Sequence, residues 1–450
     1  MIYNLKRMHT VRTMGKRILT LATGVVLGAL FVPALLHLGL LWGLFPSRDL
    51  NHASAYVREV LQIVNENYVD PKASSYDALA RSAIHGLVES LDPHSEFMEA
   101  KDNEELEEDL SGEFGGIGIE VETRSDRIVV IAPIAGTPGE RAGILRGDEI
   151  TGIDGHRLGA GSTMEDVVGR LRGKPNTRVS VSLFRPGTGK NFDLTLTREI
   201  IKVDSVGDAR VLDGDVGYIQ VKEFSEHTGE EFVNAVNRLL KQNIDSLVID
   251  LRNNPGGLLD AAVEVAEPFF RKGEIIVYTQ GRKPADREDY RAESEGDPLE
   301  LPVAVLINAG TASAAEIVTG ALKDTGRAVI VGERSFGKGS VQAIFKLKDG
   351  EALRLTTAKY YTPSGVSIHE KGIAPQVEVI MTPDEDFKLR QQHGRPDLLG
   401  QPAEFRTVFG FDPIEDRQLQ TALDVLKGVD MLDGQADAAA AAAKKAGGGR

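Results

Sequence analysis

Short apolar runs alternate with amphipathic helical stretches between residues 216 and 332. The runs occupy residues 216–224, 246–251, 275–279, 302–307 and 328–332. Runs this short and this rich in valine, isoleucine and leucine are typical of buried β-strands, and the stretches between them are typical of helices that cover a sheet. This alternation of strands and helices predicts a layered α/β core.

Two of the predicted helices begin at glycine-containing turns directly after a strand. Asn253-Asn254-Pro255-Gly256-Gly257 leads into a helix that continues to Phe270, and Gly310 ends the strand that precedes a helix opening at Ser313. The first N–H groups of a helix have no partner and lie at the positive end of its dipole, so they stabilise a developing negative charge. Gly257 and Ser313 therefore both lie at strand-to-helix junctions, as a shared oxyanion site would require.

A serine hydroxyl is a weak nucleophile until a base removes its proton. Lys338 lies between Gly337 and Gly339, which allow the backbone to pack closely around a desolvated amine. Burial disfavours the ammonium form, so a buried Lys338 could be that base, and the amide of Gln342 could hold it in place. From spacing alone, the favoured alternative is simpler: Ser313 would cap a helix and Lys338 would be a surface residue.

Composition excludes several kinds of chemistry. The chain has no cysteine, which removes disulfides, thiol nucleophiles and thiolate metal sites. Its net charge is −15, and the first 48 residues carry six Lys or Arg and no acid, so the remainder is near −21 (−15 − 6) and nucleic acid is not an expected partner. No His-Glu-x-x-His or Gly-x-Ser-x-Gly motif occurs, and the nine histidines show no metal-ligand spacing. We therefore expect no metal or cofactor.

Three separated motifs resemble one family of enzymes. They are Gly-Thr-Ala-Ser-Ala-Ala-Glu (310–316), Phe-Gly-Lys-Gly-Ser-Val-Gln (336–342) and Asp-Leu-Arg-Asn-Asn-Pro-Gly-Gly-Leu (250–258). Together they resemble the bacterial carboxy-terminal processing peptidases, or tail-specific proteases, which are serine peptidases with a Ser-Lys pair and an embedded PDZ domain. The resemblance runs from about Tyr56 to about Gly428. It implies a multidomain α/β protein whose catalytic core, residues 199–380, is similar to crotonase and Clp protease.

The resemblance also implies roles for single residues. Ser313 matches the nucleophile, Lys338 the general base and Gln342 the residue that orients the lysine. The N–H of Ala314 and one N–H of the Gly256-Gly257 pair match the oxyanion hole, and the sequence does not decide between the two glycines. Ala315 departs from the pattern, because many members of the family carry a second serine there. The implied activity is a serine endopeptidase that cleaves proteins near their C-termini.

Residues 111–198 resemble a PDZ domain. Glycines in Phe114-Gly115-Gly116-Ile117-Gly118-Ile119 would let backbone N–H groups converge on a peptide's terminal carboxylate, and the next strand would pair with the peptide. No Gly-Lys-Ser/Thr follows these glycines, which argues against a nucleotide-binding loop. Arg172 lies where the family has a basic residue near the contact between PDZ and protease. The expected tail-binding residues are Gly116, Ile117, Gly118, Ile119 and Arg172, with a side-chain pocket formed by Val167, Val168 and Leu171.

The N-terminus predicts a membrane anchor. Residues 1–17 are basic, and the 30 residues from Ile18 to Ser47 contain no Asp, Glu, Lys or Arg. Since about 20 apolar residues span a bilayer, residues 18–45 are predicted to form an uncleaved transmembrane signal anchor. The positive flank predicts a cytoplasmic N-terminus and a catalytic body in the bacterial periplasm or its equivalent. A cleaved signal peptide is the rival, but the only Ala-x-Ala-like site after the run, Ala53-Ser54-Ala55, lies well beyond its end.

The other segments carry weaker signals. Residues 49–110 are predicted to be helical, with a break at Tyr68-Val69-Asp70-Pro71 and an acidic helix over 96–109. Polar composition predicts loops over 282–300 and 383–412. The C-terminal extension, 381–430, contains a predicted short helix at 416–427, and the Ala/Lys/Gly tail at 431–450 is predicted to be disordered.

The expected partners follow from these assignments. They are protein substrates with exposed apolar C-terminal tails and, at the N-terminal helix, a lipid bilayer. The resemblance leaves room for an activating lipoprotein or adaptor and for a homo-oligomer. Three alternatives stay open: a Ser-His-Asp triad that uses His369, a crotonase-like acyl transformation without a nucleophile, and an inactive PDZ adaptor that holds C-terminal tails at the membrane.

Overall fold

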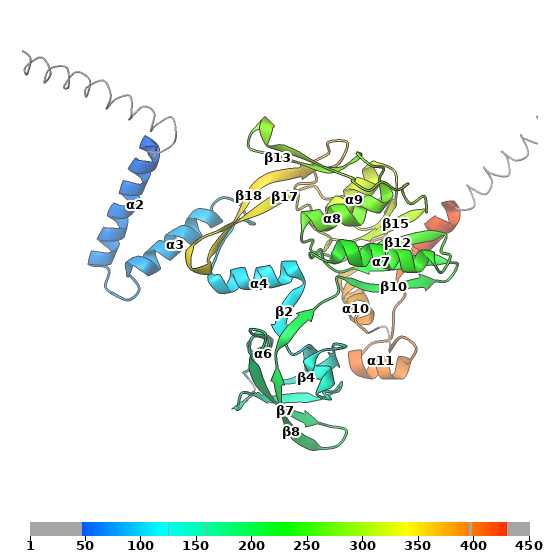
Figure 1. The fold of residues 1–450 in the computed structure, drawn as a ribbon, viewed down its shortest axis with the longest axis horizontal. Coiled ribbons are helices and arrows are strands. Elements are labelled where there is room, and N and C mark those ends of the chain that lie inside the picture. Colours follow the sequence, from blue (N-terminus) through cyan, green and yellow to red (C-terminus); the bar gives the residue numbers. More distant parts are fainter. Residues whose placement is uncertain (1–46, 125, 160, 396–397, 430–450) are drawn as a thin grey trace, which may run out of the picture. The chain divides into compact units, whose positions relative to one another are not determined.

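A computed structural model describes residues 47–124, 126–159, 161–395 and 398–429 (Figure 1). The anchor predicted for residues 18–45, the basic segment 1–17 and the tail 431–450 lie outside the described residues. Within the described ranges, no helix is long and apolar enough to cross a membrane. The chain divides into two compact units, the first ending at Ser90 and the second beginning at Leu91.

The first unit contains two helices, α2 (Arg48–Asn67) and α3 (Tyr76–Glu89). Each begins at a serine whose hydroxyl accepts a hydrogen bond from a backbone N–H three residues on. Such capping satisfies one of the free donors of the first turn. The break predicted at residues 68–71 lies between the two helices.

A six-stranded sheet forms the centre of the second unit. Its order is β10-β11-β12-β15-β16-β19. The strands from β11 to β19 are parallel, and β10 is an antiparallel edge. Four of the five predicted apolar runs form strands of this sheet, whereas the run at 275–279 forms a strand of a second sheet. The strands β10 and β19 were not predicted. The bounds are β10 (Val206–Leu212), β11 (Val216–Val221), β12 (Ser246–Asp250), β15 (Val303–Ile307), β16 (Val329–Gly332) and β19 (Val377–Glu378).

Helices cover both faces of this sheet. On one face lie α7 (Thr228–Leu240), α8 (Leu259–Ala266) and α9 (Ala314–Asp324), which share a buried cluster with β11, β12 and β15. On the other face, Ala422 and Leu426 of the helix at residues 417–429 pack against Val248 and Leu306. Every residue of β12 and β15 is buried, which explains why their sequences do not alternate with polar residues.

A second, antiparallel sheet has the order β1-β18-β13-β14, and β17 also pairs with β18. Its strands are β1 (Glu96–Met98), β13 (Ile275–Gly281), β14 (Arg287–Arg291), β17 (Ser340–Lys346) and β18 (Ala352–Tyr361). The predicted loop at 282–300 is wrong in its middle, because β14 is a polar edge strand. The acidic helix predicted over 96–109 begins later, at α4 (Ala100–Ser111), because β1 pairs with β18.

The loop predicted over 383–412 is also wrong. This stretch contains α10 (Pro383–His393) and α11 (Pro402–Phe409). Thr382 and Glu385 form a capping box at the start of α10, with Pro383 in the first turn. This is a helix-start signal that outweighs polar composition. Leu389 and Phe405 are buried, so both helices belong to the packed body.

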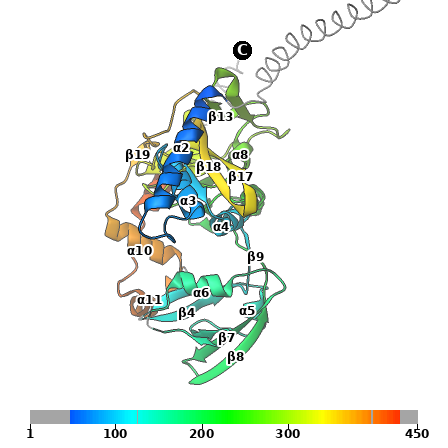
Figure 2. The ribbon, with the colours of Figure 1, turned by 90° about the vertical axis from the view of Figure 1, so that its left-hand side faces the viewer.

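Residues 113–202 form a domain with a hydrophobic cluster of its own (Figure 2). Its main sheet has the order β3-β4-β5-β7-β8, β6 pairs with β5, and β2 pairs with β9 in a separate ribbon. The strands are β2 (Glu113–Gly116), β3 (Ile119–Arg124), β4 (Arg127–Pro133), β5 (Glu149–Ile153), β6 (His156–Arg157), β7 (Arg178–Arg185), β8 (Lys190–Thr197) and β9 (Glu199–Lys202), and the helices are α5 (Pro138–Arg141) and α6 (Met164–Leu171).

Candidate active site

Ser313 is the N-cap residue of α9, at the end of a turn that follows β15. Its backbone has φ 54° and ψ −118°, a combination that residues other than glycine rarely adopt. Strain of this kind costs about 1–3 kcal/mol and persists only where the surroundings enforce it. Serine is thus held in an unfavourable conformation at the positive end of a helix.

A cavity of about 340 Å³ brings most of the predicted site residues together. Ser313 and Ala314 reach it from α9, Lys338 from the loop before β17, Gln342 from β17, and Gly257 from the loop after β12. Much of the remaining wall is apolar and comprises Leu106, Leu110, Leu258, Ile317 and Ile344. Such a lining keeps water away from the polar groups and strengthens their electrostatic interactions.

In the described part of the chain, the side chains of Ser313, Lys338 and Gln342 form no hydrogen bonds with one another. Gln342 instead donates from Nε2 to Ser340 Oγ at 2.9 Å and to Thr356 Oγ1 at 3.3 Å. Contacts between catalytic groups are often loose without substrate and tighten in the reacting complex. The predicted alignment of Lys338 by Gln342 therefore stays a prediction.

Burial lowers the pKa of Lys338 below its ordinary value of 10.5. The positive charge of Arg354, which lines the same cavity from β18, lowers this pKa further. Both effects favour the neutral amine, which is the form that can accept a proton. Burial, and then the positive charge of Lys338, lower the pKa of the His94 imidazole.

Glu316 is a site residue that the sequence analysis missed. It is fully buried, and its carboxylate joins the backbone of Ser313 to that of Lys338. Oε2 accepts hydrogen bonds from Ser313 N at 2.9 Å and Lys338 N at 2.8 Å, while Oε1 accepts from Gly337 N at 2.8 Å and Ser335 Oγ at 2.5 Å. Burial raises the pKa of Glu316, and the four donors oppose this shift. A Ser-x-x-Glu spacing at a helix start is the signal that could have revealed it.

Tyr360 makes a second connection between the same two residues. Its hydroxyl donates to Ser313 O at 3.1 Å and also hydrogen-bonds Lys338 O. The ring is 1% exposed and comes from β18. Burial raises the pKa of this phenol well above its ordinary value, so it remains a donor. Glu316 and Tyr360 therefore hold the Ser313 loop and the Lys338 loop together by separate hydrogen bonds.

Replacing Glu316 by alanine is expected to lower the free energy of unfolding by about 3 kcal/mol or more. The reason is that three backbone N–H groups and one hydroxyl lose their acceptor in a dry site. Chemical denaturation would measure the loss. Ser335→Ala removes one of the four donors and also the acceptor of Ile373 N, and it should cost about 2 kcal/mol. Equal stability of the Glu316→Ala and wild-type proteins would contradict this role for the carboxylate.

The backbone geometry distinguishes the two candidate oxyanion glycines. Gly256 N donates to Asn254 Oδ1 at 2.8 Å, so it is already occupied. In the described residues, no hydrogen bond is found for the N–H groups of Gly257 and Ala314, and both residues line the cavity beside Ser313. The geometry thus favours Gly257 over Gly256.

Both glycine positions are sterically required. The φ angles of Gly256 and Gly257 are 100° and 141°. A Cβ on Gly256 would lie 2.6 Å from Ser313 Cβ, and one on Gly257 would lie 2.1 Å from the carbonyl oxygen of Phe224. A side chain at either position would therefore displace Ser313 or the backbone of Phe224.

His369 does not line the cavity around Ser313. Its ring Nδ1 is buried and has no hydrogen-bond partner among the described residues, and its Nε2 lies 3.8 Å from the exposed Glu370. In a Ser-His-Asp triad, this ring would be oriented by a carboxylate and would reach the serine. The geometry does not support that alternative.

The domain at 113–202 carries a second cavity, of about 400 Å³. Its wall includes the predicted tail-binding residues Gly116, Ile117, Gly118, Ile119 and Arg172. Val168 and Leu171 also line it, but the prediction for Val167 is wrong, because that side chain is fully buried in the domain core. The cavity lies between the start of β3 and α6, where an added peptide strand would fit.

Arg172 connects this second cavity to α4. Its guanidinium lies 4.2 Å from the centroid of the Phe114 ring and 3.3 Å from the carboxylate of Glu108 in α4. Leu106 and Leu110 on the same helix line the cavity that contains Ser313. The helix α4 thus lines the cavity around Ser313 and contacts one residue of the second cavity, Arg172.

Comparison with known proteins assigns the chain to a family. The family model for peptidase family S41 matches residues 215–379, and the model for the PDZ domain matches residues 115–196. A carboxy-terminal-processing protease of Bartonella bacilliformis is 41% identical over 364 residues, which cover 78% of this chain and 83% of the relative. The chain belongs to peptidase family S41.

Other relatives agree with this assignment. A "probable CtpA-like serine protease" of Staphylococcus aureus is 39% identical over 324 residues, covering 72% of this chain and 64% of that relative. Among solved structures, a photosystem II D1 C-terminal processing protease is 31% identical, with a TM-score of 0.42 over 72% of this chain and 92% of that one. The two family models and the two curated relatives make this S41 protein a serine-type peptidase of the carboxy-terminal-processing family, with PDZ and peptidase domains of mixed α/β structure, as the motifs predicted.

Proposed function

We propose that this S41 peptidase is a membrane-anchored endopeptidase that cuts proteins near their C-termini with a Ser313–Lys338 dyad. The observation that carries the proposal is that one apolar-walled cavity contains the strained serine, a half-buried lysine and two backbone N–H groups, of Ala314 and Gly257, for which the described residues provide no acceptor. Nucleophile, base and oxyanion donors are the groups that acyl transfer from a peptide requires.

The reaction follows from these positions. The neutral amine of Lys338 takes the proton of Ser313 Oγ as that oxygen bonds to the scissile carbonyl carbon, and the carbonyl oxygen becomes an oxyanion held by Ala314 N–H and Gly257 N–H. The C–N bond then breaks, and the Lys338 ammonium returns the proton to the leaving amine. A water molecule, deprotonated by the same amine, attacks the resulting ester and releases Ser313.

The PDZ domain would bind the tail of the substrate. Backbone N–H groups of Gly116, Ile117 and Gly118 would receive the terminal carboxylate, and Ile119 would begin the strand that pairs with the tail. Arg172, through Glu108 and α4, would couple an occupied groove to the catalytic cavity. This arrangement favours proteins with unstructured, apolar C-terminal tails as substrates.

The remaining parts of the proposal concern location. The uncharged run at residues 18–45 supports a single-pass anchor in the bacterial inner membrane, with the catalytic body in the periplasm. An activating lipoprotein or adaptor and a homo-oligomer are compatible with this arrangement. No metal-binding group of three or more His, Cys, Asp or Glu is found in the described residues, and no cofactor takes part in the proposed reaction.

The decisive test is hydrolysis of a long, unstructured peptide with a free apolar C-terminus. We expect cleavage by the full chain in detergent, and a roughly tenfold higher KM when the C-terminus is amidated, because the PDZ loop then loses a charge-assisted interaction of about 1.4 kcal/mol. Mass spectrometry of the products would locate the cut. Binding of the free-acid peptide without any cleavage would instead favour the adaptor alternative.

A further inference from the structure

Two loops that carry the proposed chemistry are joined into one hydrogen-bonded unit. The loop after β12 holds the glycines of the oxyanion site, and the loop after β15 leads into Ser313. Asn308 Oδ1 accepts from Asn253 N at 2.8 Å and from Gly310 N at 3.0 Å. Ala312 N donates to Asn254 O at 2.9 Å. Separation of the two loops would therefore move the N–H of Gly257 relative to Ser313 Oγ.

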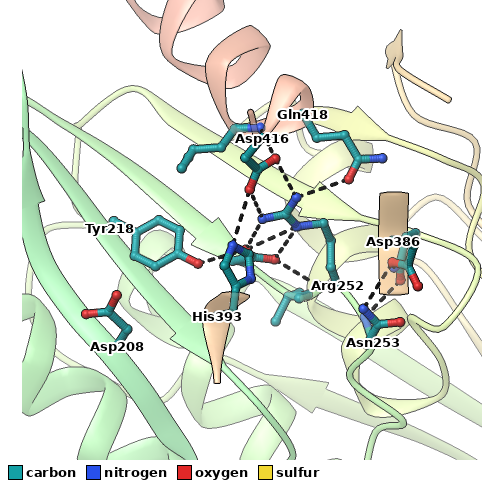
Figure 3. A network of polar contacts seen from close by, with 12 residues as sticks. Asp208, Tyr218, Arg252, Asn253, Asp386, His393, Asp416 and Gln418 are labelled. Atoms are coloured by element: carbon teal, nitrogen blue, oxygen red, sulfur yellow. Dashed lines mark hydrogen bonds and ion pairs between the residues drawn. The ribbon is translucent and has the colours of Figure 1, made fainter. Parts of the chain in front are cut away.

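Asp386 of α10 binds this unit from outside. Its Oδ1 accepts from Asn308 Nδ2 at 3.1 Å and from Asn253 Nδ2 at 3.4 Å, and Figure 3 shows the carboxylate facing Asn253. Asn308 is 5% exposed and already uses its amide oxygen on the two loops. Its NH₂ group would lack this acceptor without Asp386, and an unsatisfied buried donor favours rearrangement. The positions of the Asn253 and Asn308 side chains thus depend on a carboxylate of the C-terminal extension, that of Asp386.

The position of α10 is itself fixed by a polar network (Figure 3). Arg252 forms a two-pronged ion pair with Asp416, Nη1 to Oδ1 at 2.8 Å and Nη2 to Oδ2 at 2.7 Å, and it also pairs with Asp250 at 2.6 Å. His393 at the end of α10 lies 3.5 Å from the same Asp416. These contacts attach the C-terminal extension to Arg252, which directly precedes Asn253 in the chain. The carboxylate of Asp386 is therefore presented by a helix bound to the loop it contacts.

We infer that Asp386 is a positioning residue for the oxyanion hole. Helix α10 would thus support the catalytic site by holding the two loops that form it. The S41 family match ends at residue 379, before this helix begins. The inference rests on the proposed function of Ser313, Ala314 and Gly257. It assigns Asp386 an effect on the chemical step and none on tail binding, because the tail groove lies in the PDZ domain.

The test compares three variants of the full chain. Asp386→Ala is expected to lower kcat about 10- to 100-fold, since small displacements of catalytic groups have effects of this size. Asp386→Asn keeps an acceptor oxygen and should recover most of the activity. Asp384→Ala removes an exposed ion pair with Lys388 on the same helix and serves as the matched control. Its kcat should remain within twofold of the wild type.

The readouts separate positioning from general destabilisation. The rate of fluorophosphonate labelling of Ser313 should fall in parallel with kcat in Asp386→Ala, whereas the affinity for a fluorescent C-terminal tail peptide should stay within twofold. Equal losses in Asp386→Ala and Asp384→Ala, or a wild-type kcat in Asp386→Ala, would overturn the inference. A wild-type protein that cleaves nothing, or an active Ser313→Ala variant, would instead refute the proposed function.

Discussion

Replacing Ser313 by alanine is expected to reduce kcat for peptide cleavage by at least about 10³-fold, and by up to about 10⁶-fold if all turnover passes through the acyl-enzyme. The hydroxyl is the only group that forms a bond to the substrate in the proposed reaction. Tail-peptide affinity should not change, because the PDZ groove is formed by other residues. Cleavage assays with purified protein would measure the loss, and fluorophosphonate labelling should disappear with it.

A glycine at the same position provides a control for the backbone. Alanine keeps the positive φ of Ser313, so the strain stays, whereas glycine adopts this conformation freely. Ser313→Gly should therefore be as inactive as Ser313→Ala and at the same time about 1 kcal/mol more stable. Full hydrolysis by either variant would exclude Ser313 as the nucleophile.

Replacing Lys338 by arginine is expected to abolish activity almost as completely, by about 10³-fold or more. A guanidinium remains protonated at any working pH, so it cannot accept the serine proton. Lys338→Ala should be equally inactive. Activity of Lys338→Arg near the wild-type level would show that another group is the base.

The wild-type pH profile checks the same assignment without a mutation. A base must be deprotonated to act, so kcat/KM should rise with pH through the pKa of Lys338, which burial and Arg354 place below 10.5. Arg354→Met removes the neighbouring charge, which should raise this pKa and shift the rising limb to higher pH. A rising limb that does not move in Arg354→Met would contradict the proposed tuning of the lysine.

Prediction from sequence succeeded where local pattern and burial agree. The central parallel strands were recognisable because helices cover both faces of the sheet, so that all five residues of β15 and three of the five in β12 are apolar. It failed where polar residues form regular structure: β14 is an exposed edge strand, and α10 has a polar surface although Leu389 is buried. Both elements are stabilised by pairing or packing with residues far away in the sequence. Local composition gives no information about such contacts.

The site shows the same division. The Ser313 and Lys338 motifs lie within one short stretch, so spacing and resemblance were enough to select them. Glu316 was visible as a capping partner of Ser313, but its bonds to Gly337 and Lys338 depend on how two loops meet. The choice of Gly257 over Gly256 depends on the hydrogen bond from Gly256 N to Asn254 Oδ1. No sequence pattern predicts this hydrogen bond.

The amino-acid order alone determined the family, the layered α/β core, and the serine and lysine, because each depends on neighbours within a few residues of chain. Only the tertiary structure decided which N–H groups are free, what lowers the pKa of Lys338, and that Asp386 reaches the loops before Ser313. Those properties arise from groups far apart in sequence that share one buried, weakly solvated space, where distance and desolvation set the energies.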